Sequence, residues 1–407
     1  MNSELKSEME FLNDRKMWEA SGQRRELFGK IEKDISSGMM VMVPGLRRTG
    51  KTYLVQQILS LREKPFYFSF DKLSFQKPAV LEEVIRHAIS QGFKTIALDE
   101  VQKVQGWAGI LKGYYDHYKP KPSFLLSGSS AIHLRKGSES LSGRIYEHQL
   151  APLNYSEFLE FREIDQKFRQ NYVEDYLRTG AFPEVVLKGL EPARYARSVV
   201  DKIIGEDIPQ LYSLDNPGHL SDIVGMLAER MGQQVDWRDV GASIGIGKDT
   251  AQRYSRMLEG SFLFDIVRMR GKYGATVGKS KKVYFAHPSI AAAYADVPEG
   301  LRLEAAVYLH LKPLGSVGFF RDGPKEIDFT LERKGKALAI EVKYRNSISA
   351  SDHRALRSYM ESKGVDGVLL TKNDAEEIPV GRNTLYLVPV HEFLYSPPSI
   401  VGKKMIF

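Results

Sequence analysis

Apolar residues in the first part of the chain form short runs that alternate with amphipathic stretches. The short runs predict five strands, at residues 40–44, 65–70, 94–100, 123–128 and 146–152. Between them, residues 52–62, 78–90 and 107–118 carry apolar side chains at helical spacing. Strands that alternate with helices indicate a parallel sheet with helical crossovers, so this part is predicted to be an α/β domain.

The pattern changes twice further along the chain. From about residue 154 to residue 260, strand patterns give way to helical periodicity. Beyond residue 263, strand and helix patterns mix again, with a hairpin signal at residues 326–344. The sequence therefore predicts an α/β domain, a helical middle and a mixed C-terminal domain.

Composition narrows the class of protein. With 407 residues the chain is too long for one small core, and its net charge of +7 permits a nucleic-acid partner without requiring one. It has no cysteine, which excludes a disulfide framework, a thiol nucleophile and a cysteine zinc site. The first 20 residues are charged and lack the apolar core of a signal peptide. Since no uninterrupted apolar run approaches the roughly 18 residues of a membrane span, we expect a cytoplasmic protein without a membrane partner.

A phosphate-binding loop is the clearest motif. The sequence GLRRTGKT fits G-x-x-x-x-G-K-[ST] and lies between a predicted strand and a predicted helix. In such a loop, backbone N–H groups surround the phosphates, Lys51 reaches the β- and γ-phosphates and the Thr52 hydroxyl binds Mg²⁺. ATP and Mg²⁺ are therefore the expected cofactors. The expected nucleotide-binding residues are Gly45, Leu46, Arg47, Arg48, Thr49, Gly50, Lys51, Thr52 and Tyr53.

Two arginines in this loop exceed what nucleotide chemistry requires. We expect Arg47 and Arg48 to add positive charge near the phosphates, or to contact the lid or a neighbouring subunit and report the nucleotide state.

Polar residues at the ends of later strands supply further candidates. Asp99 and Glu100 end an apolar strand, which suits Mg²⁺ coordination by Asp99 and polarisation of the attacking water by Glu100. Ser127 closes the next strand and is a candidate γ-phosphate sensor, or a plain strand-end serine. Arg144 is a candidate arginine finger for the nucleotide of a neighbouring subunit, which would require a homo-oligomer, or a surface arginine in a loop.

Five stretches, in this order, carry a resemblance to a known family: GLRRTGKT, IALDEVQKVQGW, LLSGSSA, LSGR and TGAFPEVV. Together they resemble archaeal and bacterial AAA+-type ATPases related to the STAND class, and the C-terminal half is similar to the domain of unknown function that usually follows that module. The resemblance implies the same roles for Lys51, Thr52, Asp99 and Glu100 as above. It also implies a helical lid in which Pro183 contacts the nucleotide, although one extra residue separates Gly180 from Pro183 here.

The helical middle contains a possible DNA reader. Residues 235–254 predict a helix, a tight glycine turn and a second helix that carries the polar residues Lys248, Gln252, Arg253 and, just beyond, Arg256. Residues 268–282 then hold six basic residues and no acid, as the wing of a winged helix would. We expect salt-dependent DNA contact by this element. The alternative is that it packs only against the ATPase or its partners.

The C-terminal hairpin alternates polar and apolar residues on both sides of a Lys-Gly-Lys turn. A two-residue turn at Lys334-Gly335 places Asp328 opposite Glu341, and one at Gly335-Lys336 places it opposite Lys343. Both registers leave Asp328, Glu341 and Lys343 on one face.

Two carboxylates and a lysine on one face can bind a divalent metal and position water for phosphodiester hydrolysis. With Glu304 on an upstream helix, these residues resemble the restriction-endonuclease-like core. The resemblance implies catalytic roles for Glu304, Asp328, Glu341 and Lys343, and a second Mg²⁺ or Mn²⁺ held by Asp328 and Glu341. Alternatively, the fold is a binding platform without cleavage activity.

These interpretations together predict an α/β protein with four segments. They are an AAA+-like P-loop domain at 1–153, a helical lid at 154–215, a winged-helix segment at 216–290 and a restriction-endonuclease-like α/β domain at 291–407. The expected function is that of an Mg²⁺-dependent ATPase whose nucleotide state controls a DNA-binding, nuclease-like C-terminal half. The alternative is an ATP-gated signalling or regulatory switch with a protein partner and a catalytically inactive C-terminal scaffold.

Overall fold

The computed structural model describes residues 3–14, 18, 22–118, 121–130, 134, 139–214, 216–270, 276–323 and 325–405, with the backbone alone at 276–279 and 402–405. These residues form two compact units. The first comprises Met1–Ala151, Lys202–Asp215 and Gly260–Phe262, and the second comprises Pro152–Asp201, Asn216–Glu259 and Leu263–Phe407. The finer division into four segments stays a prediction.

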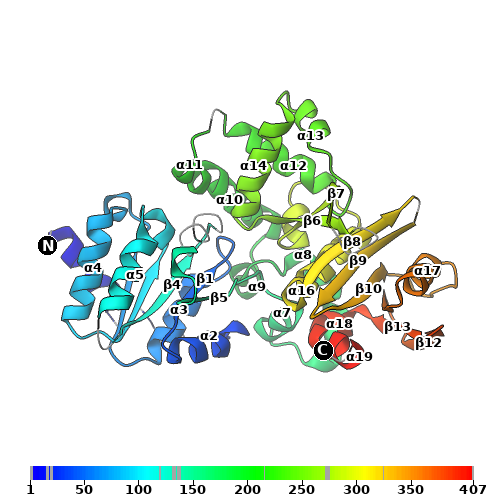
Figure 1. Cartoon of the computed structure of the whole chain (residues 1–407), viewed down its shortest axis with the longest axis horizontal. Coiled ribbons are helices and arrows are strands. Elements are labelled where there is room, and N and C mark those ends of the chain that lie inside the picture. Colours follow the sequence, from blue (N-terminus) through cyan, green and yellow to red (C-terminus); the bar gives the residue numbers. More distant parts are fainter. Residues whose placement is uncertain are drawn as a thin grey trace. The chain divides into compact units, whose positions relative to one another are not determined.

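The first unit contains the predicted parallel sheet (Figure 1). Its five strands pair in the order β2-β3-β4-β1-β5, all parallel. The strands are β1 (Met40–Pro44), β2 (Pro65–Ser69), β3 (Thr95–Asp99), β4 (Ser123–Gly128) and β5 (Ile145–Glu147). The fifth is shorter than predicted, although the N–H groups of His148 and Leu150 still donate to carbonyls of β1 beyond its end.

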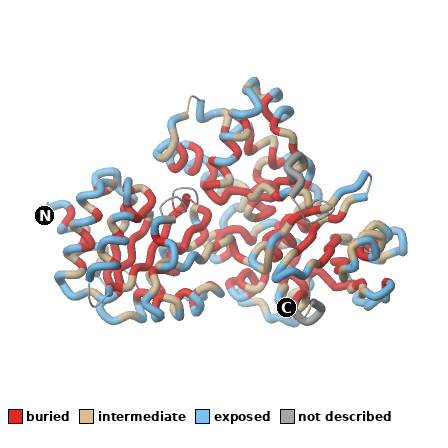
Figure 2. Tube along the Cα trace, viewed as in Figure 1, coloured by how far each residue is buried: buried red, intermediate tan, exposed pale blue. Residues whose placement is uncertain are grey.

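Helices cover both faces of this sheet, because alternate strand residues point to opposite sides. Met40 and Met42 of β1 belong to one apolar core, and Val41 and Val43 belong to the other. Helices α1 (Ser3–Leu12), α4 (Pro78–Ser90) and α5 (Trp107–His117) contribute to the first core, and α2 (Leu27–Ser36) and α3 (Lys51–Ser60) to the second. Strands β1 to β4 are consequently buried along almost their whole length, whereas the edge strand β5 is largely exposed (Figure 2).

Helices form the first part of the second unit, as the sequence predicts. They are α7 (Tyr155–Phe161), α8 (Val173–Thr179), α9 (Pro183–Lys188), α10 (Pro192–Lys202), α12 (Gly218–Glu229), α13 (Trp237–Ser243) and α14 (Lys248–Gly260). In the described part of the unit, five more helices follow among the strands: α15 (Pro288–Ala291), α16 (Glu299–Leu311), α17 (Arg354–Lys363), α18 (Val390–Tyr395) and α19 (Pro397–Met405). None of the helices in the described part of the chain is long and apolar enough to cross a membrane.

The second unit also contains an eight-stranded mixed sheet in the order β12-β13-β11-β10-β9-β8-β6-β7. Its strands are β6 (Phe264–Arg270), β7 (Thr276–Phe285), β8 (Ser316–Asp322), β9 (Lys325–Arg333), β10 (Lys336–Lys343), β11 (Asp366–Thr371), β12 (Glu376–Val380) and β13 (Asn383–Pro389). The β9–β10 hairpin has the first of the two predicted registers, with Phe329 opposite Ile340. Lys334 and Gly335 form its turn with φ values of 49° and 79°, the backbone that a tight two-residue hairpin requires.

Candidate functional site

The phosphate loop lies at the carboxyl end of β1, between Pro44 and the start of α3 at Lys51. Gly45 admits no side chain, because a Cβ atom there would lie 2.3 Å from the carbonyl oxygen of Leu150. Leu46 and Thr49 are buried, and the Thr49 hydroxyl donates to the Leu46 carbonyl at 2.8 Å. These contacts hold the backbone of the loop in place.

Lys51 extends back into this loop. Its Nζ donates to the carbonyl oxygens of Gly45 and Leu46, both at 3.0 Å. Burial lowers the pKa of Lys51, and the nearby carboxylates of Glu100 and Asp99 act in the opposite direction. Phosphate oxygens can replace the two carbonyl oxygens as acceptors of the Lys51 hydrogen bonds. The ammonium is therefore already positioned in the loop to bind a phosphate group.

The carboxylate of Asp99 accepts hydrogen bonds from side chains on three other elements, α3, β2 and β4. Its Oδ2 accepts hydrogen bonds from the Thr52 hydroxyl at 2.8 Å and the Tyr67 hydroxyl at 2.9 Å. Its Oδ1 accepts from the Ser127 hydroxyl at 2.6 Å and the Glu100 N–H at 3.1 Å. The carboxylate is therefore held in a fixed orientation with Thr52 beside it, an arrangement that fits Mg²⁺ bound by a phosphate loop.

Glu100 follows Asp99 in a left-handed backbone conformation, with φ of 54°. One of its carboxylate oxygens accepts from Gln102 Nε2 at 2.5 Å and from the Ser129 hydroxyl at 3.1 Å. Burial and the neighbouring Asp99 raise the pKa of Glu100, whereas Lys51 and Gln102 lower it. A carboxylate whose pKa is shifted toward neutrality can take a proton from water.

Arg47 and Arg48 have different environments despite being adjacent. Arg47 NH1 donates to Asp207 Oδ1 at 2.7 Å, and NH2 lies 3.8 Å from a carboxylate oxygen of Glu206. Asp207 ends a π-helical turn (Ile203–Asp207) within the same unit, and among the described residues its buried Oδ2 has no partner. Arg48 is exposed and adopts φ of 68°. Glu206 and Asp207 lie in the range predicted for the lid, so Arg47 makes a contact of the kind expected of the arginine pair. A report of the nucleotide state through this contact stays a prediction.

Replacing Arg47 with alanine is expected to destabilise the first unit by about 1–3 kcal/mol and to alter ATP turnover. The substitution removes the guanidinium that lowers the pKa of Asp207, a carboxyl whose pKa burial already raises. Chemical denaturation and steady-state ATPase assays would measure both effects. Arg48→Ala is the matched control and should change stability by less than about 0.5 kcal/mol, since its side chain is exposed. Equal effects of the two substitutions would contradict this assignment.

Two supporting residues have no signal in the sequence. Tyr67 lies on β2 within an aromatic run typical of a buried strand, yet its hydroxyl donates to Asp99. Arg25 is buried and donates to the carbonyl oxygens of Thr49 at 2.7 Å and Ala151 at 2.8 Å. Both residues position the loop and its acid from segments distant in the sequence.

Three other predicted residues lie away from this group or in the other unit. Arg144 precedes β5 at the amino-terminal edge of the sheet, opposite the phosphate loop, and Asp116 accepts from its Nε at 2.9 Å. Arg144 therefore does not reach the phosphate loop of its own chain. Its role as an arginine finger for the nucleotide of a neighbouring subunit stays a prediction. Pro183 begins α9 in the second unit, and its nucleotide contact also stays a prediction. Tyr53 directly follows Thr52 on α3, but its side chain is exposed and its nucleotide contact stays a prediction.

The four predicted C-terminal residues lie in one partly buried cluster of the second unit. Lys343 Nζ is 2.7 Å from Glu341 Oε1, and Asp328 accepts from the Val342 N–H at 2.9 Å. Burial and Asp328 raise the pKa of Glu341 to about 7, and the same two causes raise the pKa of Glu304 to about 7.

The sequence did not predict three further members of this cluster. Lys282 Nζ lies 2.7 Å from Glu326 Oε1 and 3.2 Å from Glu304 Oε1, which also accepts from the Tyr284 hydroxyl at 2.5 Å. Within the described ranges, no three acidic or histidine side chains are arranged to hold a metal ion. Two lysine ammonium groups, those of Lys282 and Lys343, are already paired with carboxylates of this cluster, so these residues do not fit the expected second Mg²⁺ or Mn²⁺.

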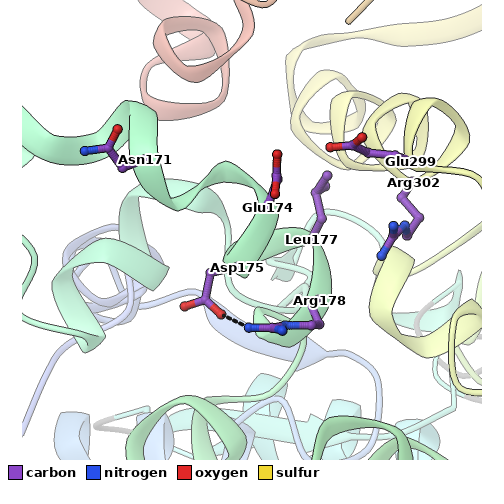
Figure 3. Close-up of a pocket in the computed structure, with 7 residues that line it drawn as sticks. All are labelled: Asn171, Glu174, Asp175, Leu177, Arg178, Glu299 and Arg302. Carbon is purple, nitrogen blue, oxygen red and sulfur yellow. Dashed lines mark hydrogen bonds and ion pairs between the residues drawn. The ribbon is translucent and has the colours of Figure 1, made fainter.

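A separate polar pocket of about 480 Å³ lies between α8 and α16 of the second unit (Figure 3). Glu174 and Leu177 extend from α8, and Glu299 and Arg302 from α16. Within the pocket lining, Asp175 Oδ1 pairs with Arg178 at 3.2 Å. None of the predicted site residues lines this pocket.

Comparison with known proteins agrees with the geometry of the first unit. Residues 37–159 match the family model described as AAA domain. Residues 170–300 and 300–393 match two models described as domains of unknown function, DUF8612 and DUF4143.

Relatives and a solved structure span most of the chain. An uncharacterized protein of Haemophilus influenzae is 26% identical over 377 residues, covering 85% of this chain and 92% of that protein. An uncharacterized protein of Methanocaldococcus jannaschii is 22% identical over 376 residues, covering 84% of each. The Walker-type ATPase PABY2304 of Pyrococcus abyssi aligns with 66% of this chain and 95% of its own, with 18% identity and a TM-score of 0.46. Given the matched family model and the phosphate loop inside it, the chain carries an AAA-type ATPase domain at residues 37–159, for which ATP, with Mg²⁺, is the cofactor.

Proposed function

We propose that this protein is an Mg²⁺-dependent ATPase whose nucleotide state controls a nucleic-acid-binding surface in its second unit. The hydrogen bond between Thr52 and Asp99, beside the buried Lys51, is the observation that carries the ATPase part. In this proposal, Lys51 binds the β- and γ-phosphates, and Thr52 and Asp99 hold Mg²⁺ directly or through its water. The bound Mg²⁺ neutralises charge on the phosphates.

The remaining residues around Asp99 act on the attacking water and on orientation. Glu100 accepts a proton from that water, since its carboxylate is buried and its pKa is raised. Ser127 and Tyr67 orient Asp99 through their hydroxyl groups. Ser127 Oγ can exchange its partner for a γ-phosphate oxygen, which would make it the sensor expected from its position.

Basic residues on the second unit support the nucleic-acid part. Arg268 of β6 and Lys281 of β7 lie directly opposite each other in the antiparallel pair. Like charges at such positions destabilise a sheet, so a polyanion is the natural counterion. Burial lowers the pKa of Lys281, and so do the neighbouring charges of Arg268, Arg256 and Lys248. Arg256 and Lys248 are exposed on α14.

The order of elements around this surface supports a winged-helix interpretation. Helices α12, α13 and α14 precede the β6–β7 pair, and Gln234 forms an isolated bridge with Lys282. We interpret α14 as the recognition helix and β6–β7 as the wing. The centre of the wing, residues 271–275, lies outside the described residues.

We further propose that the C-terminal sheet is a restriction-endonuclease-like scaffold without cleavage activity. The convergence of Glu304, Asp328, Glu341 and Lys343 supports the fold. The ammonium of Lys282 among the carboxylates argues against metal-dependent hydrolysis.

Replacing Lys281 or Arg256 with glutamine is expected to weaken binding to a fluorescein-labelled DNA duplex. Each change should also lower the salt dependence of log K by about one unit, because one phosphate contact is lost. Fluorescence anisotropy at several salt concentrations, with ADP and with a non-hydrolysable ATP analogue, would measure both effects and their dependence on nucleotide.

Lys188→Gln is the matched control, since Lys188 is an exposed lysine of the same unit that pairs with Glu184. It should leave affinity and salt slope unchanged. Absent or salt-independent duplex binding by the wild-type protein would overturn the nucleic-acid proposal and favour an ATP-gated switch that acts on a protein partner.

A further inference from the structure

Lys282 is an almost fully buried lysine, with 2% of its surface exposed. Its ammonium lies 2.7 Å from Glu326 and 3.2 Å from Glu304, and 5.4 Å from the ring centroid of Phe319. Burial lowers the pKa of Lys282, but the carboxylates of Glu304, Asp328 and Glu326 more than offset this, so the pKa lies above its usual value. Lys282 is therefore a charged group inside the protein.

The three carboxylates around it come from two different elements. Glu304 lies on α16, and Glu326 and Asp328 lie on β9. Carboxylates packed this closely repel one another unless a cation lies between them. The structure supplies that cation from a third element, β7.

The neighbouring residue Lys281 has the opposite environment. Successive residues of a strand point to opposite faces, so Lys281 faces the basic surface near Trp237, at 5.9 Å from the ring centroid, while Lys282 faces the acidic cluster. One strand thus presents one ammonium to the outer surface and one to the interior.

We propose that the Lys282 ammonium is the resident cation of this cluster, in the place of a divalent metal, and that it anchors β7 to α16 and β9. The cluster binds no divalent cation while Lys282 is present. Removing the ammonium takes away the lysine that Glu304 and Glu326 share, although Arg321 NH1 still lies 3.6 Å from Glu326 Oε2 and Lys343 still acts on Asp328. Hard divalent cations bind groups of carboxylate oxygens that have lost such a cation. This inference concerns the second unit alone and does not depend on nucleotide binding.

The test is a titration of the nucleotide-free protein with Mn²⁺. The electron paramagnetic resonance signal of free Mn²⁺ measures how much of the ion is bound. Lys282→Met should bind one more Mn²⁺ per chain than the wild type, at least about tenfold more tightly than any wild-type binding outside the nucleotide site. Lys282→Arg keeps a cation and should gain none. Lys281→Met, on the opposite face of the same strand, should also gain none. Adding Glu326→Gln to Lys282→Met should remove the extra ion.

Two results would overturn the proposal. One is wild-type Mn²⁺ binding that disappears in Asp328→Asn, since the cluster would then hold metal beside Lys282. The other is a folded Lys282→Met protein that gains no Mn²⁺. If Lys282→Met folds poorly, Mn²⁺ should raise its Tm while leaving that of Lys281→Met unchanged, and a failure of Mn²⁺ to do so equally contradicts the proposal.

Discussion

Replacing Lys51 with alanine is expected to lower ATP turnover by at least about 100-fold and to weaken ATP binding. The substitution removes a buried ammonium that the loop already holds by hydrogen bonds to Gly45 and Leu46. No other cation occupies this position, as far as the described residues show, because Arg47 is paired with Asp207 and Arg48 is exposed. Steady-state phosphate release and binding of a fluorescent ATP analogue would measure the two losses.

A matched control separates this effect from a general loss of positive charge. Lys30 is exposed on α2 of the same unit, and Lys30→Ala should leave both measurements unchanged. Undiminished turnover in Lys51→Ala would mean that the phosphate loop is not the hydrolytic site.

The sequence predicts the nucleotide site well because its residues have fixed spacing or follow strand ends. The spacing of glycine, lysine and threonine in GLRRTGKT is typical of a phosphate-binding loop. Asp99 and Ser127 lie together because the carboxyl ends of neighbouring parallel strands meet at one edge of the sheet. The role of Tyr67 in the site could not be predicted in this way, because an aromatic residue in a buried strand is ordinarily a core residue. Its hydroxyl reaches Asp99 only because β2 pairs beside β3, and that neighbour relation is a property of the topology.

The β9–β10 hairpin shows what local rules leave open. Alternation predicts which residues share a face, but two turn positions satisfy it equally. The observed turn has positive φ at Lys334 and Gly335, and this selects the register that brings Asp328 next to Glu341. A lysine with positive φ is uncommon, so the sequence alone gives little reason to prefer it.

Lys282 marks the limit of prediction from patterns. Residues 268–282 contain six basic residues, and this pattern predicts that all of them belong to one solvent-facing wing. The strand alternation that separates Lys281 from Lys282 is obscured, because Val283, Tyr284 and Phe285 are all buried. Only the position of α16 against β7 reveals that Lys282 meets Glu304.

Replacing Glu100 with glutamine is expected to reduce ATP turnover by about 100-fold or more while leaving ATP binding intact. Glutamine keeps the size of the side chain but cannot accept a proton from water. Asp99 retains its hydrogen bonds to Thr52 and Ser127, so the proposed Mg²⁺ residues are undisturbed. The contrast with Lys51→Ala, which should lose binding as well, assigns the two residues to different steps.

The pH dependence of turnover tests the same role without removing the carboxylate. Burial raises the pKa of Glu100, and since the ionised form is the base, turnover should fall as the pH is lowered through that raised pKa. Gln102 donates to Glu100 and lowers its pKa, so Gln102→Leu should move the acid limb of the kcat profile to higher pH. Wild-type levels of turnover in Glu100→Gln, or an acid limb that Gln102→Leu leaves in place, would assign the proton transfer to another group. Because the limb moves only if Glu100 titrates during turnover, this shift distinguishes a base from a residue that merely supports the loop.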